Sequence, residues 1–428
     1  MEKLQIIKYP PKNTWQQILA RPAYETEGLF DTVRVVLNDV KNRGDEAVAE
    51  YSEKFDKVKL SNFEVSENEI AQAENEISEP LKQAIKIAHQ NIFKFHSAQL
   101  FDHKPVETSN GVFCQQKAVA IEKVGLYVPG GSAPLFSTVL MLAIPAQIAG
   151  CEEIIICTPP DINGKIHPAI LYAAKISGVH KIFKIGGIQA IAAMVYGTKS
   201  VPKVYKIFGP GNRYVTAAKQ LVSLSKVAID MPAGPSEVEV IADFTANPAF
   251  VAADMLSQAE HGADSQAILI TNEEKLIEQV LEEINLQLAK LPRREIATKA
   301  LENSKIILVN TIDEAVELTN EYAPEHLIIS TQNPEKVANN IKNAGSIFLG
   351  NYSPESAGDY VSGTNHTLPT NGFAKQYSGL NLDSFMKKIT IQNITKQGLA
   401  NISNAIILMA ENEGLQAHSN AVKIRLGL

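Results

Sequence analysis

Cysteine, tryptophan and long apolar runs are all scarce in this chain of 428 residues, which has three cysteines and one tryptophan. Cys114, Cys151 and Cys157 form no CxxC pair, so a disulfide framework and a thiolate zinc site are both excluded, and reduced thiols are expected. The most apolar stretch, 135–150, is too short to cross a bilayer and contains Pro145. With no signal-peptide pattern at the N-terminus, the sequence predicts a cytoplasmic protein without a membrane segment.

Positive charge is also limited. The chain has 40 Lys and Arg against 47 Asp and Glu, a net charge of −7, and no dense basic run. Nucleic-acid binding through bulk electrostatics is therefore not expected. The composition is 45% hydrophobic and 20% charged, which is typical of a globular chain and excludes extensive disorder. Its length predicts about two to four domains, and small-molecule chemistry is the favoured kind of function.

The fold prediction is α/β, with two doubly wound, Rossmann-like globes built on parallel sheets. Residues 29–57 and 66–99 have apolar positions at helical spacing. From about residue 119 the chain repeats a short β-branched strand, a Gly/Pro loop and an amphipathic helix, which predicts a parallel sheet covered on both faces. The strands expected in this first series are VGLYV (124–128), EIIIC (153–157), KIFKI (181–185), VYKIF (204–208) and VAID (227–230).

A second series of helices and strands follows from about residue 245, with strands AILIT, KIILV, HLIIS and SIFLG. The loop-rich stretch 351–380 has no periodicity, and loops of that length are usually functional. The tail is expected to contain the strand ITIQNI, a helix over 396–411 and the strand AVKIRL. The predicted division is an N-terminal arm (1–20), a discontinuous first globe (21–125 and 238–380), a nucleotide-binding globe (126–237) and a C-terminal tail (381–428).

A nucleotide site is suggested by three loops that follow strands of the second globe: YVPGGSAP, KIGGIQA and FGPGN. Ligands of parallel sheets bind beyond the carboxyl ends of the strands, and these loops present Tyr127, Gln189 and Asn212. The GPGN segment lies between a strand and a helix, as a phosphate-binding loop would. Tyr214 replaces the third glycine of a dinucleotide motif, so a simple tight turn remains an alternative.

Several histidines lie in dense polar segments that could bind a metal. Gln258 and His261 in SQAEHG are three residues apart, so they share one helix face. Asp359 precedes His366 by seven residues, and His418 lies in the tail. A set of His, Asp and Gln donors suits zinc or manganese. Purely structural roles remain open for each of these residues.

The dipeptide Glu325-His326 in YAPEHLIIS precedes an apolar strand. Histidine suits proton transfer near neutral pH, and a neighbouring carboxylate can activate water. A solvent-exposed histidine at a strand edge is the alternative interpretation.

Long segments of the chain together resemble one family, histidinol dehydrogenase. They are GLYVPGGSAPLFSTVLMLAIPAQIAGC, KIFGPGN, IDMPAGPSEV, DMLSQAEHG, YAPEHLII and GSIFLGNYSPESAGDYVSGTNHTLPT. The resemblance extends over essentially the whole chain and includes NRGDEAVAEYSEKFD near the N-terminus. It implies a four-electron oxidation of L-histidinol to L-histidine, the last step of histidine biosynthesis, with NAD and one zinc ion per subunit.

The resemblance also implies roles for individual residues. Glu325 and His326 would transfer protons, and Tyr127, Gln189 and Asn212 would bind NAD. The zinc ligands would be Gln258, His261, Asp359 and His418. The substrate would contact the ligand residues together with Ser236, His326, His366 and Glu413.

The family is homodimeric, so the resemblance implies that the tail bearing Glu413 and His418 completes the site of the partner subunit. Three other functions stay open on the residues alone. They are a related zinc- and NAD-dependent dehydrogenase for another alcohol, a metallohydrolase that uses Glu325 to activate water, and a nucleotide-binding scaffold without activity.

Overall fold

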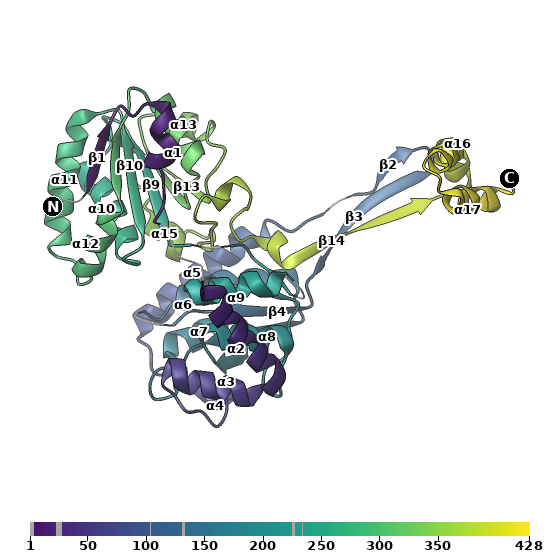
Figure 1. Ribbon diagram of the computed structural model, residues 1–428, viewed down its shortest axis with the longest axis horizontal. Helices are drawn as coiled ribbons and strands as arrows, with labels where there is room; N and C mark the ends of the chain where they lie inside the picture. Colours follow the sequence, from purple (N-terminus) through teal and green to yellow (C-terminus); the bar gives the residue numbers. More distant parts are fainter. Residues whose placement is uncertain (1–3, 23–27, 103, 131–132, 225–226, 233) are drawn as a thin grey trace.

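The protein consists of two α/β globes and a long arm that projects from them (Figure 1). The computed structural model describes residues 4–22, 28–102, 104–130, 133–224, 227–232 and 234–428. The sheet of the first globe, sheet A, is parallel, as expected for near-continuous apolar strands covered on both faces. Its strand order is β1 (Gln5–Lys8), β11 (Lys305–Leu308), β10 (Gln266–Thr271), β9 (Glu237–Ala242), β12 (His326–Ser330) and β13 (Ser346–Leu349).

Helices bury both faces of sheet A in separate apolar clusters. One face is covered by α10 (Pro248–Ala259), α11 (Glu274–Leu288) and α12 (Arg294–Glu302). The other is covered by α1 (Trp15–Ile18), α13 (Ile312–Tyr322) and α14 (Pro334–Ala338), with Trp15 and Tyr322 in its core. The short helix α15 (Glu355–Tyr360) follows β13 and contacts α10.

The sheet of the second globe, sheet B, is also parallel. Its strand order is β6 (Lys181–Lys184), β5 (Glu153–Thr158), β4 (Lys123–Tyr127), β7 (Lys206–Phe208) and β8 (Ala228–Ile229). One face packs against α4 (Glu67–Ala73), α5 (Glu79–Ser97), α6 (Phe136–Ala149) and α7 (Pro168–Ile176). The other packs against α2 (Leu29–Arg43), α3 (Asp45–Tyr51), α8 (Gly187–Tyr196) and α9 (Arg213–Ser223). The predicted α/β class, with two doubly wound globes, is confirmed.

The predicted division of the chain needs correction in two places. Helices α2–α5, expected within the first globe as part of 21–125, pack on α6, α7, α8 and α9 of the second globe. Their apolar faces therefore complete the core of sheet B. The N-terminal segment 1–20 is more than an arm, because β1 pairs with β11 at the edge of sheet A.

The arm is a β-ribbon capped by two helices (Figure 1). Its antiparallel sheet has the order β14 (Met386–Ile394), β3 (Val112–Ala120) and β2 (Val106–Ser109), and it leads to α16 (Lys396–Asn412) and α17 (Gln416–Leu426). Thus β3, which the sequence placed in the first globe, pairs along its whole length with the tail. AVKIRL, expected as a strand, lies within α17. No helix in the described ranges is both long and apolar enough to span a membrane.

Candidate active site

A cavity of about 360 Å³ lies between the two globes. Strands β4 and β7 of sheet B approach it with their carboxyl ends, through Pro129 and the loop 209–211, whereas β9 and β12 of sheet A approach it with their amino ends. The predicted residues that line it are Ser236, His261, Glu325, His326, Asp359 and His366. The lining residues extend from Pro129 to Thr370, so residues up to 241 positions apart in the sequence meet in this cavity.

Glu325 and His326 are buried at the start of β12 and are both held by the backbone of Glu237 at the start of β9. The N–H of Glu237 donates to Glu325 Oε2 at 2.9 Å. The carbonyl oxygen of Glu237 lies 3.3 Å from His326 Nδ1, so Nδ1 carries the proton there. His326 Nε2 has no hydrogen-bond partner among the described residues and is left to act on a ligand. The alternative of an exposed strand-edge histidine is wrong, because His326 is only 4% exposed.

Three carboxylates surround His326. Its Nδ1 is 3.6 Å from Glu355 Oε1 and 3.7 Å from Glu325 Oε2, and its Nε2 is 3.6 Å from Asp359 Oδ1. Burial by itself would lower the pKa of His326, but these charges outweigh it and raise the pKa to about 10. Burial raises the pKa of Glu325 to about 8. The cluster therefore holds exchangeable protons near neutral pH, as acid–base chemistry requires.

Glu355 was not predicted from the sequence. It lies in α15, is 1% exposed, and neither of its carboxylate oxygens has a hydrogen-bond partner within the described chain. Nothing in the local string SPES distinguishes it from a surface glutamate at a helix start. Only the packing of α15 against α10 brings it to His326.

A group of oxygen and nitrogen donors suited to a cation lies beside His326. His261, Glu355 and Asp359 each place one ligand atom within 4.8 Å of the others. Gln258 is fully buried in α10, and both polar atoms of its side chain are unpartnered in the part of the chain that is described. Burying an amide without hydrogen bonds is costly. The donor set of Gln258, His261 and Asp359 therefore fits a divalent cation such as zinc.

His366 joins the two globes at this cavity. Its Nδ1 donates to the carbonyl oxygen of Asp359 at 2.9 Å, and its Nε2 is 3.2 Å from the hydroxyl of Thr138 in α6. Burial lowers the pKa of His366, which favours this neutral form. Asn365 donates to the carbonyl oxygen of Met141 at 2.7 Å. That carbonyl lacks its helical partner because residue 145, within α6, is proline. The free carbonyl therefore anchors the loop that carries His366.

Glu413 and His418 lie outside this cavity. Glu413 ends α16 and His418 is in α17, and both are exposed at the far end of the arm (Figure 1). A single chain thus brings His261 and Asp359 of the predicted ligand set into one cavity. Gln258 is buried in α10, three residues before His261, and His418 lies apart.

A buried network that was not predicted from the sequence holds the side chain of Glu237, whereas Glu325 and His326 contact its backbone. Arg21 forms a bidentate pair with the carboxylate of Glu237, at 2.5 and 2.9 Å, and lies over the ring of Tyr322. The hydroxyl of Tyr322 donates to Glu237 and lies 2.7 Å from Gln266 Oε1. Acidic residues in the otherwise apolar strand EVEVIA were the available signal, because buried acids require partners.

Arg21→Met is expected to destabilise the protein by about 3–5 kcal/mol, because it leaves the carboxylate of Glu237 buried without its cation. The Arg21 and Glu237 side chains are only 17% and 3% exposed. The matched control is Arg34→Met, whose pair with Asp31 is 58% and 81% exposed and should contribute about 0–1 kcal/mol. Denaturant unfolding measures both variants. Equal unfolding midpoints for Arg21→Met and Arg34→Met would contradict a stabilising role for the Arg21–Glu237 pair.

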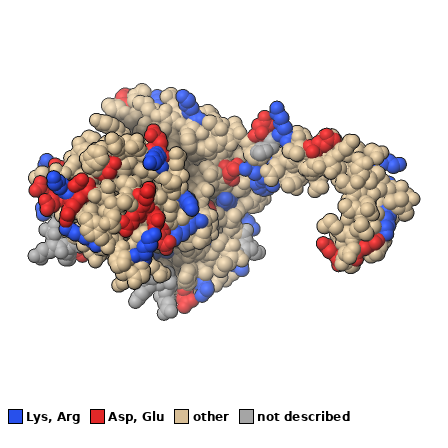
Figure 2. Space-filling model, turned by 90° about the horizontal axis from the view of Figure 1, so that it is seen from above, with Lys and Arg blue, Asp and Glu red and all other residues tan. Residues whose placement is uncertain are grey.

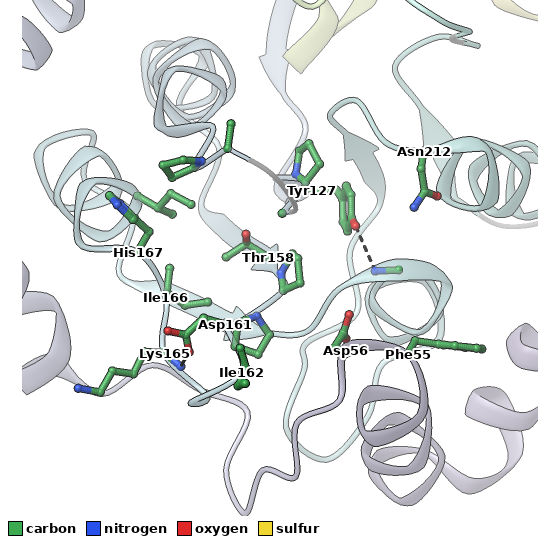
Figure 3. A pocket seen from close by; sticks show the side chains of 18 of the residues that line it. Phe55, Asp56, Tyr127, Thr158, Asp161, Ile162, Lys165, Ile166, His167 and Asn212 are labelled. Carbon is green, nitrogen blue, oxygen red and sulfur yellow. Dashed lines mark hydrogen bonds between the residues drawn. The ribbon is translucent and has the colours of Figure 1, made fainter. Parts of the chain in front are cut away.

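A second and larger cavity, of about 1030 Å³, lies against the carboxyl ends of β4 and β5 (Figure 3). Tyr127 and Asn212, two of the residues predicted to bind a nucleotide, line it. The Tyr127 hydroxyl accepts from the N–H of Gly187 at 3.1 Å, and Asn212 caps α9. Gln189 is fully buried and does not line this cavity. Its amide donates instead to Asp56 Oδ2 at 3.1 Å.

The GPGN loop between the two cavities is tightly fixed. Gly209 has φ of +116°, and a Cβ atom there would lie 2.0 Å from the carbonyl oxygen of Tyr127, so only glycine fits. Its N–H donates to Asp230, and its carbonyl oxygen accepts from Lys219. Lys219 and Asp230 form a buried ion pair at 2.5 Å. GPGN is thus a tight turn that also lines a cavity, and nucleotide binding by this loop stays a prediction.

Comparison with known proteins gives a consistent result. The family model described as histidinol dehydrogenase matches residues 19–426. Histidinol dehydrogenase of Bacteroides thetaiotaomicron is 68% identical over 423 residues, 99% of each chain. That of Escherichia coli K12 is 52% identical over 414 residues, covering 96% of this chain and 94% of the relative. The crystal structure of histidinol dehydrogenase from Elizabethkingia anophelis superposes with a TM-score of 0.98 at 54% identity, over 99% of this chain and 98% of that one.

The family model and these relatives span both globes and the arm, and so include every segment on which the resemblance was based. The chain belongs to the histidinol dehydrogenase family, oxidoreductases that act on a CH–OH group.

Proposed function

We propose that the protein oxidises L-histidinol to L-histidine with two NAD⁺, through a bound aldehyde, in a zinc-dependent reaction shared between two subunits. The observation that carries this proposal is one cavity lined by Glu325, His326, His261 and Asp359, the last two of which belong to a possible cation site. The side chain of the nearby Gln258, buried in α10, has no hydrogen-bond partner among the described residues. Family membership supplies the substrate and the coenzyme.

His326 acts as the proton carrier. Its Nδ1–H is held by the Glu237 carbonyl, so Nε2 takes the hydroxyl proton as hydride leaves the carbinol carbon for the nicotinamide. Glu325 then activates a water molecule that adds to the aldehyde, and the hydrate is oxidised in the same way. The first oxidation releases one proton and one hydride, and the second releases the same, so two NADH form per substrate.

The cation would be held by Gln258, His261 and Asp359, with His418 of the partner subunit. Such a cation would orient the substrate imidazole and amine, and by attracting the Asp359 carboxylate it would offset part of the negative charge that raises the pKa of His326. Ser236, His366 and Glu413 are proposed as further substrate contacts. Ser236 and His366 already line the cavity.

The coenzyme is proposed to occupy the larger cavity, with its nicotinamide directed past Pro129 toward His326. Pro129 lines both cavities, which makes them adjacent. Proline and isoleucine side chains form much of the wall, as suits an adenine ring. Tyr127 and Asn212 flank this space, and Gln189 contributes through Asp56.

The arm is proposed to exchange between two subunits of a homodimer. It stands free of the body, and Figure 2 shows only scattered charged side chains along it. Apolar side chains on it are exposed, including Ile389, Leu408, Met409 and Ile424 at 48%, 52%, 65% and 77%. Strand β14 is an open edge of nine residues. Isolated ribbons of this kind are marginally stable alone and require a partner surface.

A cytoplasmic location is part of the proposal. Cys114, Cys151 and Cys157 are all free thiols, which suits a reducing compartment.

Counting NADH tests the proposed reaction. Zinc-loaded protein is incubated with limiting histidinol and excess NAD, and absorbance of the reduced nicotinamide is recorded to completion. The expected yield is two NADH per histidinol, with histidine as the product. A yield of one would instead favour a simple alcohol dehydrogenase, and no NADH would favour hydrolytic chemistry at the metal.

Bound zinc is expected to decrease as pH falls below about 6, because a histidine must be neutral to ligate a metal. Burial lowers the pKa of His261, so its imidazole is neutral at pH 7 and its ligation resists mild acid. Metal content after gel filtration and activity after return to pH 7 should decline together. Full turnover of protein stripped by a chelator would contradict the role given to the metal.

A further inference from the structure

We propose that Asp56 recognises the adenosine ribose of NAD and excludes NADP, an inference that rests on the proposed NAD-dependent function. Asp56 was not among the residues predicted from the sequence. It belongs to the N-terminal helical layer, outside sheet B, and it nonetheless faces the cavity assigned to the coenzyme.

Asp56 reaches the cavity from the last position of a π-helical turn, Ser52–Asp56, that directly follows α3. Figure 3 shows its carboxylate directed into the space below Tyr127. The packing of α2 and α3 on α8 fixes this turn against the edge of sheet B. The wall containing Asp56 is therefore a rigid part of the second globe.

Neutral donors hold the Asp56 carboxylate. Gln189 Nε2 donates to Oδ2 at 3.1 Å, and the backbone N–H of Gly186 donates to the same carboxylate. Gly186 is the N-cap of α8, so Asp56 occupies the positive end of that helix, where a phosphate could otherwise bind. Asp56 forms no ion pair with a Lys or Arg within the described residues. Burial raises the pKa of Asp56, the two donors oppose that shift, and no described cation pairs with the carboxylate.

The position of Asp56 corresponds to the adenosine half of the coenzyme. The nicotinamide must lie near His326, which lines the smaller cavity, and Asp56 lines only the larger one. A carboxylate in such a place can accept a hydrogen bond from the ribose 2′-hydroxyl, as the acid of dinucleotide-binding folds does. Here the acid comes from a helical layer rather than from the end of a sheet strand.

The same carboxylate disfavours a 2′-phosphate. Two anions in contact within a partly buried cavity repel each other, and no Lys or Arg of the described ranges pairs with Asp56 to offset that repulsion. Lys165, the Lys that lines this cavity, is exposed and extends away from Asp56 (Figure 3). NAD should therefore bind and NADP should be rejected.

Equilibrium binding of NAD and NADP to zinc-loaded Asp56→Asn tests this inference. Asn still accepts from Gly186 and so keeps the helix cap, but it lacks the charge. The expected result is that NAD binds about fivefold more weakly and NADP about tenfold more tightly than to the wild type. Glu53→Gln, an exposed acid in the same turn, is the matched control and should change neither affinity. Asp56→Ser serves as a second variant with the same expected direction.

Three results would overturn the inference. Unchanged affinities in both variants would show that Asp56 does not contact the coenzyme. An equal loss of NAD and NADP binding, together with a lowered melting temperature, would show that Asp56 only caps α8 and does not select the coenzyme. Failure of the wild type to bind NAD would overturn the proposed function and this inference together, whereas the first two results leave the proposed function intact.

Discussion

His326→Asn is expected to reduce kcat by about a thousandfold for both histidinol and histidinaldehyde, within the range for loss of a general base. His326 is the proposed proton carrier in both oxidations. Its Nε2 has no hydrogen-bond partner among the described residues and lies 3.6 Å from Asp359 Oδ1. Asn can preserve the hydrogen bond to the Glu237 carbonyl, so the local structure should be retained. Steady-state rates with each substrate measure the effect.

Glu325→Gln serves as the contrasting variant. Gln can still accept from the Glu237 N–H that now donates to Glu325. It cannot take a proton from water, so formation of the aldehyde should be nearly normal while its conversion to histidine slows by about a hundredfold. Rapid-quench analysis should then show the aldehyde accumulating on the enzyme. Equal losses on both substrates in both variants would contradict the separate roles of the two residues.

Mixing two inactive variants, His326→Asn and His418→Ala, is expected to restore activity to about a quarter of the wild-type value after complete subunit exchange. Half of the dimers are then mixed. Each mixed dimer has one site that combines the intact His326 of one chain with the intact His418 of the other. Activity measured before and after exchange, with exchange followed by mass spectrometry, gives the result.

The matched control mixes His326→Asn with Glu325→Gln. Both changes lie in the body of the chain, so every site in a mixed dimer keeps one defect and activity should not return. Recovery of activity in the control mixture would mean that the arm does not complete a neighbouring site. The same conclusion would follow if the mixture of His326→Asn and His418→Ala stayed inactive despite proven subunit exchange.

Much of the cavity between the two globes was predicted from the sequence, because its polar residues lie in short segments that interrupt regular αβ units. SQAEHG ends a buried helix, and EH begins a strand, so the periodicity of the flanking apolar residues located both. Sheet B followed from five short apolar strands. Strand β9 was nonetheless missed, since its two glutamates disrupt an apolar pattern that would otherwise indicate a central strand.

Other parts of the fold and the site depend on tertiary packing, which the local sequence pattern does not predict. Amphipathic helices α2–α5 carry apolar faces that could cover either sheet, and only the fold shows that they cover sheet B. AVKIRL alternates like a strand but forms the end of α17, where α16 packs beside it. Glu355 and Asp56 look like ordinary surface acids in sequence. Each becomes a cavity residue through contacts with elements distant along the chain.

Anomalous diffraction from crystals of the zinc-loaded protein tests the central claim most directly. The predicted result is one zinc peak per cavity, beside His326, bound by Gln258, His261 and Asp359 together with His418 of the partner subunit. A zinc peak elsewhere would contradict the account. An active dimer whose crystals show these four side chains ordered but binding no zinc would contradict it as well.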